Sequence, residues 1–434
     1  MGRITAAVLP LLLMAGPQTP PLSADERALA AYVDAHNDEA LALLERVVNV
    51  NSGTMNLAGV QEVGTIFRAE LDALGFRTRW VDQSSLGRAG HLIAEHPGPG
   101  PKVLLIGHLD TVFEKDSPFQ KFSRVDATTA RGPGVIDMKG GDVVLVSALK
   151  AIRAGGLLDA MNLVVVLNGD EEEPGRPYAS ARQPLVDAAR DAEIAIGFED
   201  GDGDPQHAVT ARRGTTSWEL HVTAKSGHSS QIFSNDLGSG AVFEAARVLN
   251  AFRERLSSEA HLTFNPGLIV GGTVVQADAV LSRGSAEGKT NVVAGDVRVL
   301  GDLRALSVEQ FANARKTMEA IVASPLPNTV SKISFDEGYP PMAPTDGNTR
   351  LLTMYDQASR DLGFPAVTAV SPDRAGAADV SFVAGHVKMI LDAVGLKGRD
   401  DHSFNETADL KTLPMQTKRA AVLLARVARQ GAAR

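Results

Sequence analysis

Short, almost continuously apolar runs recur in the first and last parts of the chain. They are rich in Val, Ile and Leu, a composition typical of parallel strands that are covered on both faces. Stretches with helical spacing of apolar residues separate them, so the pattern predicts an open α/β sheet. Lys388 interrupts the last run, which indicates a strand near the sheet edge or a solvent-facing strand end. The expected strands are 102–106, 163–167, 194–196 and 387–391, and the expected helices lie within 25–76, 141–152 and 183–192.

A different pattern occupies the middle of the chain. Polar and apolar residues alternate there, as in residues 217–222, which is typical of antiparallel strands with one exposed face. Helical stretches at 240–256 and 308–322 and a strand within 295–303 accompany this alternation. We therefore expect a smaller α+β domain inserted into an α/β domain. The expected bounds are 25–210 and 339–434 for the α/β domain and 211–338 for the insert.

The first 24 residues have the features of an export signal. Arg3 precedes an apolar run over residues 4–15, and Pro and small residues lead to a cleavage site near Ala24. The run is too short to span a bilayer comfortably, and no later stretch has the character of a membrane span. We expect a periplasmic or secreted protein without a membrane segment once the signal is removed.

Composition narrows the classes of partner. The chain has 434 residues, 44% of them apolar and 22% charged, a formal net charge of −9 and no cysteine. A chain of this length exceeds one ordinary hydrophobic core. The negative charge argues against binding to nucleic acid, which depends on clustered Lys and Arg. We expect a small-molecule or peptide substrate, and any metal site must use His, Asp and Glu.

Metal-binding residue types follow each predicted buried strand. His108 and Asp110 follow the first, the acidic run 170–173 follows the second, Glu199 the third and His402 the last. An open α/β sheet gathers the carboxyl ends of its strands at one edge. Because several carboxylates at one place carry excessive negative charge, they favour two divalent metals bridged by one carboxylate.

Asp137 supplies another acid, in the glycine-rich turn of residues 134–141 that opens a helix. The chain lacks His-Glu-x-x-His, the commonest single-zinc peptidase motif. The acidic run 200–204 superficially begins like a calcium loop. Pro205 and Ala211, however, occupy the positions of the required glycine and bidentate glutamate. We interpret this run as a solvated turn.

These motifs in this order resemble the aminoacylase and carboxypeptidase G family of two-zinc hydrolases, and within it the bacterial glutamate carboxypeptidases. The resemblance extends over essentially all of the mature chain. It implies a homodimeric amidohydrolase whose inserted, ferredoxin-like domain mediates dimerisation. The implied substrates are N-acyl amino acids or short peptides with a free C-terminal carboxylate, with glutamate as one candidate residue. The motifs that carry the resemblance are 107–111, 134–141, 170–172, 198–199 and 402–403.

The resemblance assigns ligands to two Zn²⁺ ions per subunit, and Co²⁺ or Mn²⁺ could occupy the same sites. Asp137 bridges the two ions in this assignment. His108 and Glu199 complete the coordination of one ion, whereas Glu172 and His402 complete that of the other. The resemblance also implies a cis peptide bond after Asp137.

Glu171 is the implied general base, and Asp110 is implied to orient the ligating imidazole beside it. Two alternatives remain open from the residues themselves. A shift by one place would exchange the roles of Glu171 and Glu172. Asp200 competes with Glu199 as the ligand after the third strand.

Three residues of the insert also match the family pattern. The resemblance implies that His228 and Asn291 reach the active site of the partner subunit and that Arg304 binds the substrate carboxylate. The chain departs from the pattern before the last strand. It keeps Asp379 there without the usual preceding hydroxyl, and Arg374 adds a positive charge.

Two other functions compete with this hypothesis. An aminoacylase or deacetylase would use the same metals with another acyl pocket. A non-catalytic exported binding protein would also combine a signal with two lobes, but it has no need for Glu171 beside Glu172. The acidic pair therefore favours an enzyme.

Overall fold

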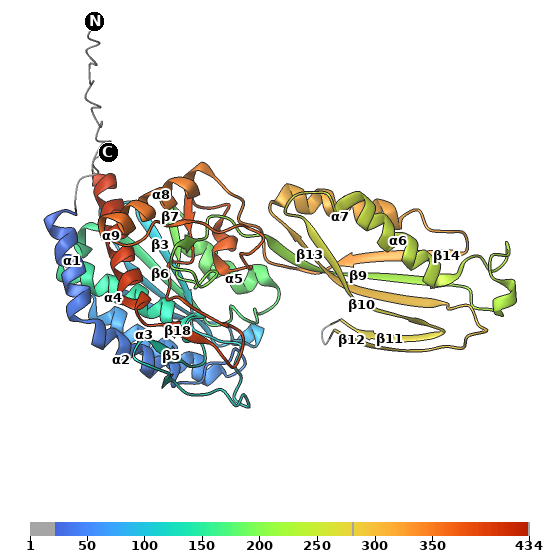
Figure 1. Cartoon of the computed structure of the whole chain (residues 1–434), viewed down its shortest axis with the longest axis horizontal. Helices are drawn as coiled ribbons and strands as arrows, with labels where there is room; N and C mark the ends of the chain where they lie inside the picture. Colours follow the sequence, from blue (N-terminus) through green and yellow to red (C-terminus); the bar gives the residue numbers. More distant parts are fainter. Residues whose placement is uncertain (1–21, 280–281, 433–434) are drawn as a thin grey trace, which may run out of the picture.

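The chain forms a larger α/β part and an elongated smaller part beside it (Figure 1). The structure is a computed structural model that describes residues 22–279 and 282–432. The expected export signal, residues 1–24, therefore lies outside the described residues except for its last three positions. None of the described helices is long and apolar enough to cross a membrane.

A six-stranded mixed sheet of order β1-β2-β6-β3-β7-β16 forms the centre of the larger part. Strands β6, β3, β7 and β16 run parallel to one another, whereas β2 is antiparallel to both of its neighbours, β1 and β6. The four predicted strands are all present, and β16 lies at the sheet edge, as Lys388 indicates. The bounds are Arg77–Asp82 for β1, Gly90–His96 for β2, Lys102–His108 for β3, Asn162–Asn168 for β6, Ile194–Gly197 for β7 and Met389–Leu391 for β16.

Helices cover both faces of this sheet because its strands are apolar on both sides. Val103 and Leu105 of β3 pack into the core cluster shared with α4 and α9, whereas Leu104 and Ile106 pack into the cluster shared with α5. The helix expected over 183–192 begins earlier, with Pro184 inside it. The helices are α1 Ala24–Ala35, α2 Asn37–Val48, α3 Leu57–Ala73, α4 Lys139–Ala154, α5 Tyr178–Ala188, α8 Asp346–Asp361 and α9 Thr412–Ala432.

Short strands complete the larger part and shape its surface near the strand ends. Strands β17 and β18 flank the loop that carries His402 and join a small sheet of order β17-β18-β5-β4. This sheet fixes the loop beside the carboxyl end of β3. The bounds are Ser123–Arg124 for β4, Thr129–Arg131 for β5, Gly398–Arg399 for β17, Thr407–Asp409 for β18, His207–Ala208 for β8 and Thr368–Ala369 for β15.

The smaller part is an antiparallel sheet of order β10-β13-β9-β14 with α6 and α7 on one side (Figure 1). Its βαββαβ connectivity is that of a ferredoxin-like unit. Both helices have the bounds that the sequence predicts. The elements are β9 Gly214–Ala224, α6 Gly240–Leu256, β10 Thr263–Gly272, β13 Asp296–Ala305, α7 Val308–Val322 and β14 Thr329–Phe335, with a hairpin of β11 Val274–Asp278 and β12 Arg283–Glu287.

Two chain segments pair where the smaller part joins the larger one, and we call them the connecting ribbon (residues 209–215 and 338–342). The N–H of Thr215 donates to the carbonyl of Tyr339 at 3.0 Å, and Arg212 and Met342 exchange two backbone hydrogen bonds. A Cβ atom at Gly338 would lie 1.7 Å from the carbonyl oxygen of Thr215. Glycine is therefore needed where the two segments cross.

Candidate metal centre

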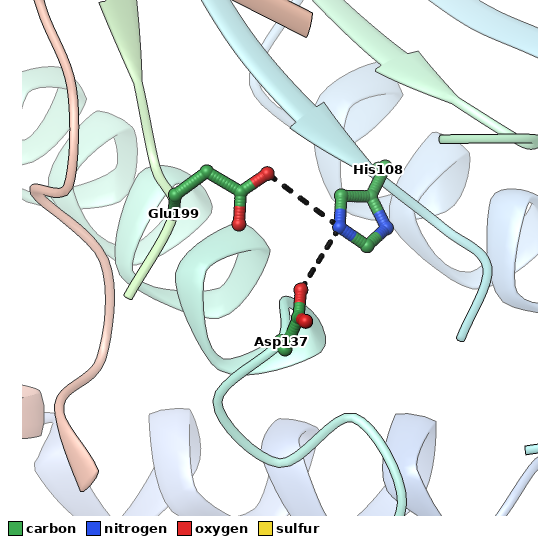
Figure 2. Close-up of side chains that lie close together, drawn as sticks. All are labelled: His108, Asp137 and Glu199. Carbon is green, nitrogen blue, oxygen red and sulfur yellow. Dashed lines mark hydrogen bonds and ion pairs between the residues drawn. The ribbon is translucent and has the colours of Figure 1, made fainter. Parts of the chain in front are cut away.

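One cluster of ligand-type side chains forms where β3 and β7 end. His108 is the last residue of β3, and its Nε2 lies 3.1 Å from Oδ1 of Asp137 and 3.6 Å from Oε1 of Glu199 (Figure 2). Asp137 comes from the turn before α4, and Glu199 follows β7. Figure 2 shows both carboxylates directed toward the same imidazole nitrogen.

A second cluster shares Asp137 with the first. The Nε2 atom of His402 lies 2.8 Å from Oδ2 of Asp137 and 3.2 Å from Oε2 of Glu172. In each cluster one ligand atom from every residue lies within 4.8 Å of the others. The two oxygens of Asp137 therefore face different clusters, as a bridging carboxylate requires.

The electrostatics of both clusters favour cations. Burial raises the pKa of Glu199 well above its usual value and that of Glu172 to about 7, where Asp137 adds to the effect. Hydrogen bonds to Asp137 and Glu172 raise the pKa of His402 to about 11. The buried Oε1 atom of Glu172 also has no hydrogen-bond partner among the described residues. Two divalent ions would coordinate the carboxylate oxygens and imidazole nitrogens of the clusters and neutralise the excess negative charge.

Asp110 fixes the backbone and the imidazole around the clusters. It is fully buried and accepts hydrogen bonds from the Thr54 hydroxyl at 2.6 Å and from the N–H groups of Glu171 and Glu172 at 3.0 and 3.1 Å. Its Oδ1 also lies 3.3 Å from Nδ1 of His108. One carboxylate thus orients a candidate ligand and the turn that carries the candidate base.

Glu406 holds the turn that presents Asp137, and no sequence pattern predicts this role. Its buried carboxylate accepts the N–H groups of Gly134 and Ile136 at 2.9 Å and that of Asp137 at 3.2 Å. The peptide bond between Asp137 and Met138 is cis, as the family resemblance implies. The contact spans about 270 positions of sequence, so no local spacing pattern could reveal it.

A buried ion network supports the turn after β6, and the sequence did not reveal this either. The guanidinium of Arg182 donates to Asp170 and to Asp379 at 2.6 Å in both cases. The amide of Asn168, the last residue of β6, donates to the second oxygen of Asp379 at 2.5 Å. Asp379, which the sequence singled out beside an unusual motif, therefore supports the site without lying in either cluster.

Two acids next to the candidate ligands, Asp200 and Glu173, lie outside both clusters. Asp200 belongs to neither cluster, and its backbone carbonyl accepts a hydrogen bond from the buried ammonium of Lys397 at 2.6 Å. The side chain of Glu173 is 64% exposed and pairs with Arg88. The structure therefore gathers Glu199 and Glu172, rather than their neighbours, at the two clusters.

A cavity of about 550 Å³ opens onto both clusters. Acidic residues dominate its wall, but three guanidinium groups also line it. Arg374 pairs with Asp202 at 3.1 Å, whereas Arg399 makes no ion pair with a described residue. The lining residues include Asp137, Glu171, Glu172, Glu199 and His402 from the centre and Arg212, Arg374 and Arg399 around it.

The candidate residues of the insert lie away from this cavity. β9 has 11 residues and runs from the connecting ribbon to Ala224, so at ~3.3 Å per residue its far end lies about 30 Å from the ribbon. His228 and Asn291 are exposed on adjacent segments beyond that end. Arg304 pairs with Thr215 at the near end but does not line the cavity, and its Nε donates to Asp302 at 3.0 Å.

The amino-acid sequence is similar to that of a known protein family and of a characterised relative. Residues 104–427 match peptidase family M20/M25/M40. The chain is 26% identical to Carboxypeptidase G2 of Pseudomonas sp. (strain RS-16) over 388 residues, which are 88% of this chain and 87% of the relative.

Solved structures show the same fold over most of the chain. The aminopeptidase PepT of Bacillus cereus is similar with a TM-score of 0.72 and 18% identity, over 90% of this chain and 99% of that one. The YXEP protein of Bacillus subtilis, a dinuclear metal binding peptidase of the M20 family, gives a TM-score of 0.61 and 14% identity, over 91% and 99%.

Proposed function

Because the chain belongs to peptidase family M20/M25/M40 and is thus a metallopeptidase, we propose that it releases a C-terminal amino acid from N-acyl amino acids or short peptides. The observation that carries the proposal is the pair of clusters that share Asp137, with Glu171 beside them in one cavity. Glutamate is the first candidate for the released residue. An aminoacylase or deacetylase activity at the same metals is the second candidate function.

The donor set fits two divalent metal ions, and zinc is the first candidate. His108, Asp137 and Glu199 would hold one ion, while Asp137, Glu172 and His402 would hold the other. Such ions polarise the substrate carbonyl and lower the pKa of an attacking water.

Glu171 is the proposed general base. It lines the cavity between the two clusters, and its backbone is fixed by Asp110. Burial raises the pKa of its carboxyl well above the usual value, which suits a group that must take a proton from water and pass it to the leaving nitrogen. The side chain of Glu171 thus moves the proton while the other acids of the site remain ligands.

Guanidinium groups on the cavity wall support a substrate with a free carboxylate. Arg399 has no ionic partner among the described residues, and Arg374 shares only Asp202. Either group could bind a carboxylate through two parallel hydrogen bonds. The similarity to Carboxypeptidase G2 over 88% of the chain also supports a substrate with a free C-terminal carboxylate. Arg304 could contribute only after movement of the insert or from a partner subunit.

Hydrolysis of a panel of N-acyl amino acids and dipeptides by the metal-loaded protein tests the proposal. Glu171→Gln and a chelator-treated sample should lose release of the free amino acid. Glu173→Gln, which changes an exposed neighbour, should keep it. C-terminal glutamate substrates should rank first.

Other outcomes would favour a different function or a different catalytic base. Preference for N-acetyl substrates regardless of the amino acid would favour the aminoacylase. Full activity of Glu171→Gln would overturn the assignment of the base. Tight ligand binding without hydrolysis would favour a non-catalytic exported binding protein.

We also propose that the protein is a homodimer and that residues 1–24 direct its export to the periplasm or the medium. β10 is an edge strand of its sheet, and apolar side chains are exposed nearby. Phe233 and Phe243 are 66% and 52% exposed and their tilted rings lie 5.5 Å apart, and Val242 on α6 is 51% exposed. Such an exposed apolar patch is typical of an interface. Cell fractionation with and without residues 1–24 tests the export.

A further inference from the structure

Tyr339 contacts both the connecting ribbon and the turn that carries Glu171. Its backbone carbonyl accepts the N–H of Thr215, the second residue of β9, at 3.0 Å. Its phenolic hydroxyl donates to the backbone carbonyl of Glu171 at 2.8 Å. One residue therefore joins the inserted domain to the centre of the active site.

The peptide group between Glu171 and Glu172 is held from two sides. Its N–H donates to Asp110 at 3.1 Å, and its carbonyl accepts from Tyr339 at 2.8 Å. The first contact comes from the metal centre, and the second comes from the ribbon. Because this peptide adjoins the Cα atom of Glu171, its orientation controls where the Glu171 carboxylate points.

The surroundings of Tyr339 keep the phenol in place as a donor. The residue is only 9% exposed, and its ring packs edge-on against Phe382 at 4.9 Å and Tyr178 at 5.8 Å. Arg182 donates to the phenol oxygen at 3.4 Å, which leaves the phenolic proton for Glu171. Burial raises the pKa of Tyr339 well above its usual value, so the hydroxyl stays protonated.

The segment around Tyr339 is held by both parts of the chain, by α5 of the larger part and by β9 of the insert. The carboxylate of Glu337 accepts the N–H of Tyr178 at 3.0 Å, and Gly338 crosses Thr215 without room for a Cβ atom. Rotation of the insert about the ribbon must therefore displace Tyr339 or break its contacts.

We propose that Tyr339 is a positioning residue that couples the orientation of the inserted domain to the placement of the Glu171 carboxylate. The inference rests on the proposed role of Glu171 as general base. Tyr339 does not itself line the cavity, and its hydrogen bond reaches the backbone carbonyl of Glu171 rather than the carboxylate. Its effect should therefore fall on turnover and leave substrate and metal binding unchanged.

Tyr339→Phe removes one oxygen and keeps the ring. We expect kcat to fall roughly 5- to 10-fold, as the loss of one hydrogen bond allows, with KM, metal content and Tm close to those of the parent. Tyr178→Phe is the matched control, because its hydroxyl meets only the exposed Arg176 side chain at 3.3 Å. It should keep kcat. Unchanged kcat in Tyr339→Phe would overturn the proposal, and so would a parallel loss of metal.

The orientation of the inserted domain can be measured directly, and a purely local role of Tyr339 would leave it unchanged in Tyr339→Phe. The chain has no cysteine, so spin labels can be attached specifically at Gln61→Cys on α3 and Lys316→Cys on α7, both exposed positions. Labelled protein is diluted with unlabelled protein so that only distances within one chain are measured. We expect Tyr339→Phe to broaden the distance distribution, and an unchanged distribution would contradict the coupling.

Glu171→Gln, measured in parallel, distinguishes a failure of this inference from a failure of the proposed function on which it rests. If Glu171→Gln remains active, the base assignment fails. If Glu171→Gln is inactive while Tyr339→Phe turns over at the parental rate, only the coupling fails.

Discussion

The carboxylate of Glu406 lies beneath the turn that presents Asp137 and accepts the N–H of Asp137 at 3.2 Å. The same carboxylate also binds two further N–H groups of that turn. Without it, three buried donors would lose their acceptor and the shared carboxylate would lose its fixed direction. The position of the bridging group thus depends on a residue that would contact no metal.

Glu406→Ala should therefore weaken metal binding by about 10- to 100-fold, the usual effect of removing an outer partner of a metal site. Competition with a fluorescent chelator measures the affinity. Glu62→Gln, an exposed change on α3, is the control and should leave the affinity unchanged. Parental affinity in Glu406→Ala would show that the turn keeps its shape unaided.

Metal binding should strengthen as the pH rises. Hydrogen bonds to Asp137 and Glu172 raise the pKa of His402 to about 11 in the metal-free protein, so a proton occupies this imidazole at neutral pH. An incoming metal must displace that proton, and this competition weakens at higher pH. We expect about tenfold tighter binding at the second cluster per pH unit between pH 7 and 9. Proton release in weakly buffered solution measures it, and binding without proton release would contradict it.

Arg182→Ala should strongly destabilise the larger part of the chain. It would leave Asp170 and Asp379 buried without their cation, which costs about 3–5 kcal/mol in comparable pairs. Urea unfolding of the metal-free protein measures the loss. Arg190→Ala is the control, because its pair with Asp187 is on the surface and such pairs contribute about 0–1 kcal/mol. Equal stability of the two variants would contradict the expectation.

Co-expression of His228→Ala and Glu171→Gln should restore activity that neither variant has alone. Each mixed dimer would contain one site with an intact Glu171 and an intact His228 from the partner. With random assembly, about one quarter of all sites would be complete. Activity should therefore reach about one quarter of the parental value. No recovery in mixtures shown to contain heterodimers would overturn the shared site.

Phe243→Asp should convert the proposed dimer to monomers. The substitution places a charge in the exposed apolar patch of Phe233, Val242 and Phe243, where a dimer would have to bury it at considerable cost. Sedimentation velocity measures the assembly state. Val308→Asp is the control, since Val308 is also exposed, at 71%, but lies at the start of α7. A dimer that survives Phe243→Asp would place the interface elsewhere.

Much of the fold follows from local patterns. Residues 163–167 lie in β6 because a strand covered on both faces needs apolar side chains in both directions. The bounds of α7 agree with the prediction because Ser307 caps its first turn through the N–H of Gln310. The start of α5 was less evident, because Pro184 is accommodated inside the helix instead of marking its beginning.

The outer support of the site could not be predicted in the same way. Glu406, Arg182 and Tyr339 each make a contact that spans between 157 and 272 positions of sequence. They bind mainly backbone groups and buried acids, so neither periodicity nor motif spacing distinguishes them from other polar residues. The contacts of these residues form only when distant segments of the chain pack together.

The alternation of strands and helices and the kinds of ligand after the strands can be predicted from residue order alone, because both depend on local patterns along the chain. Which atoms come into contact depends on how distant segments pack. Glu199 contacts His108, whereas the contact of its neighbour Asp200 with Lys397 is made by the backbone carbonyl. Only packing brings Asp137 between the imidazoles of His108 and His402, which lie almost three hundred residues apart in the sequence.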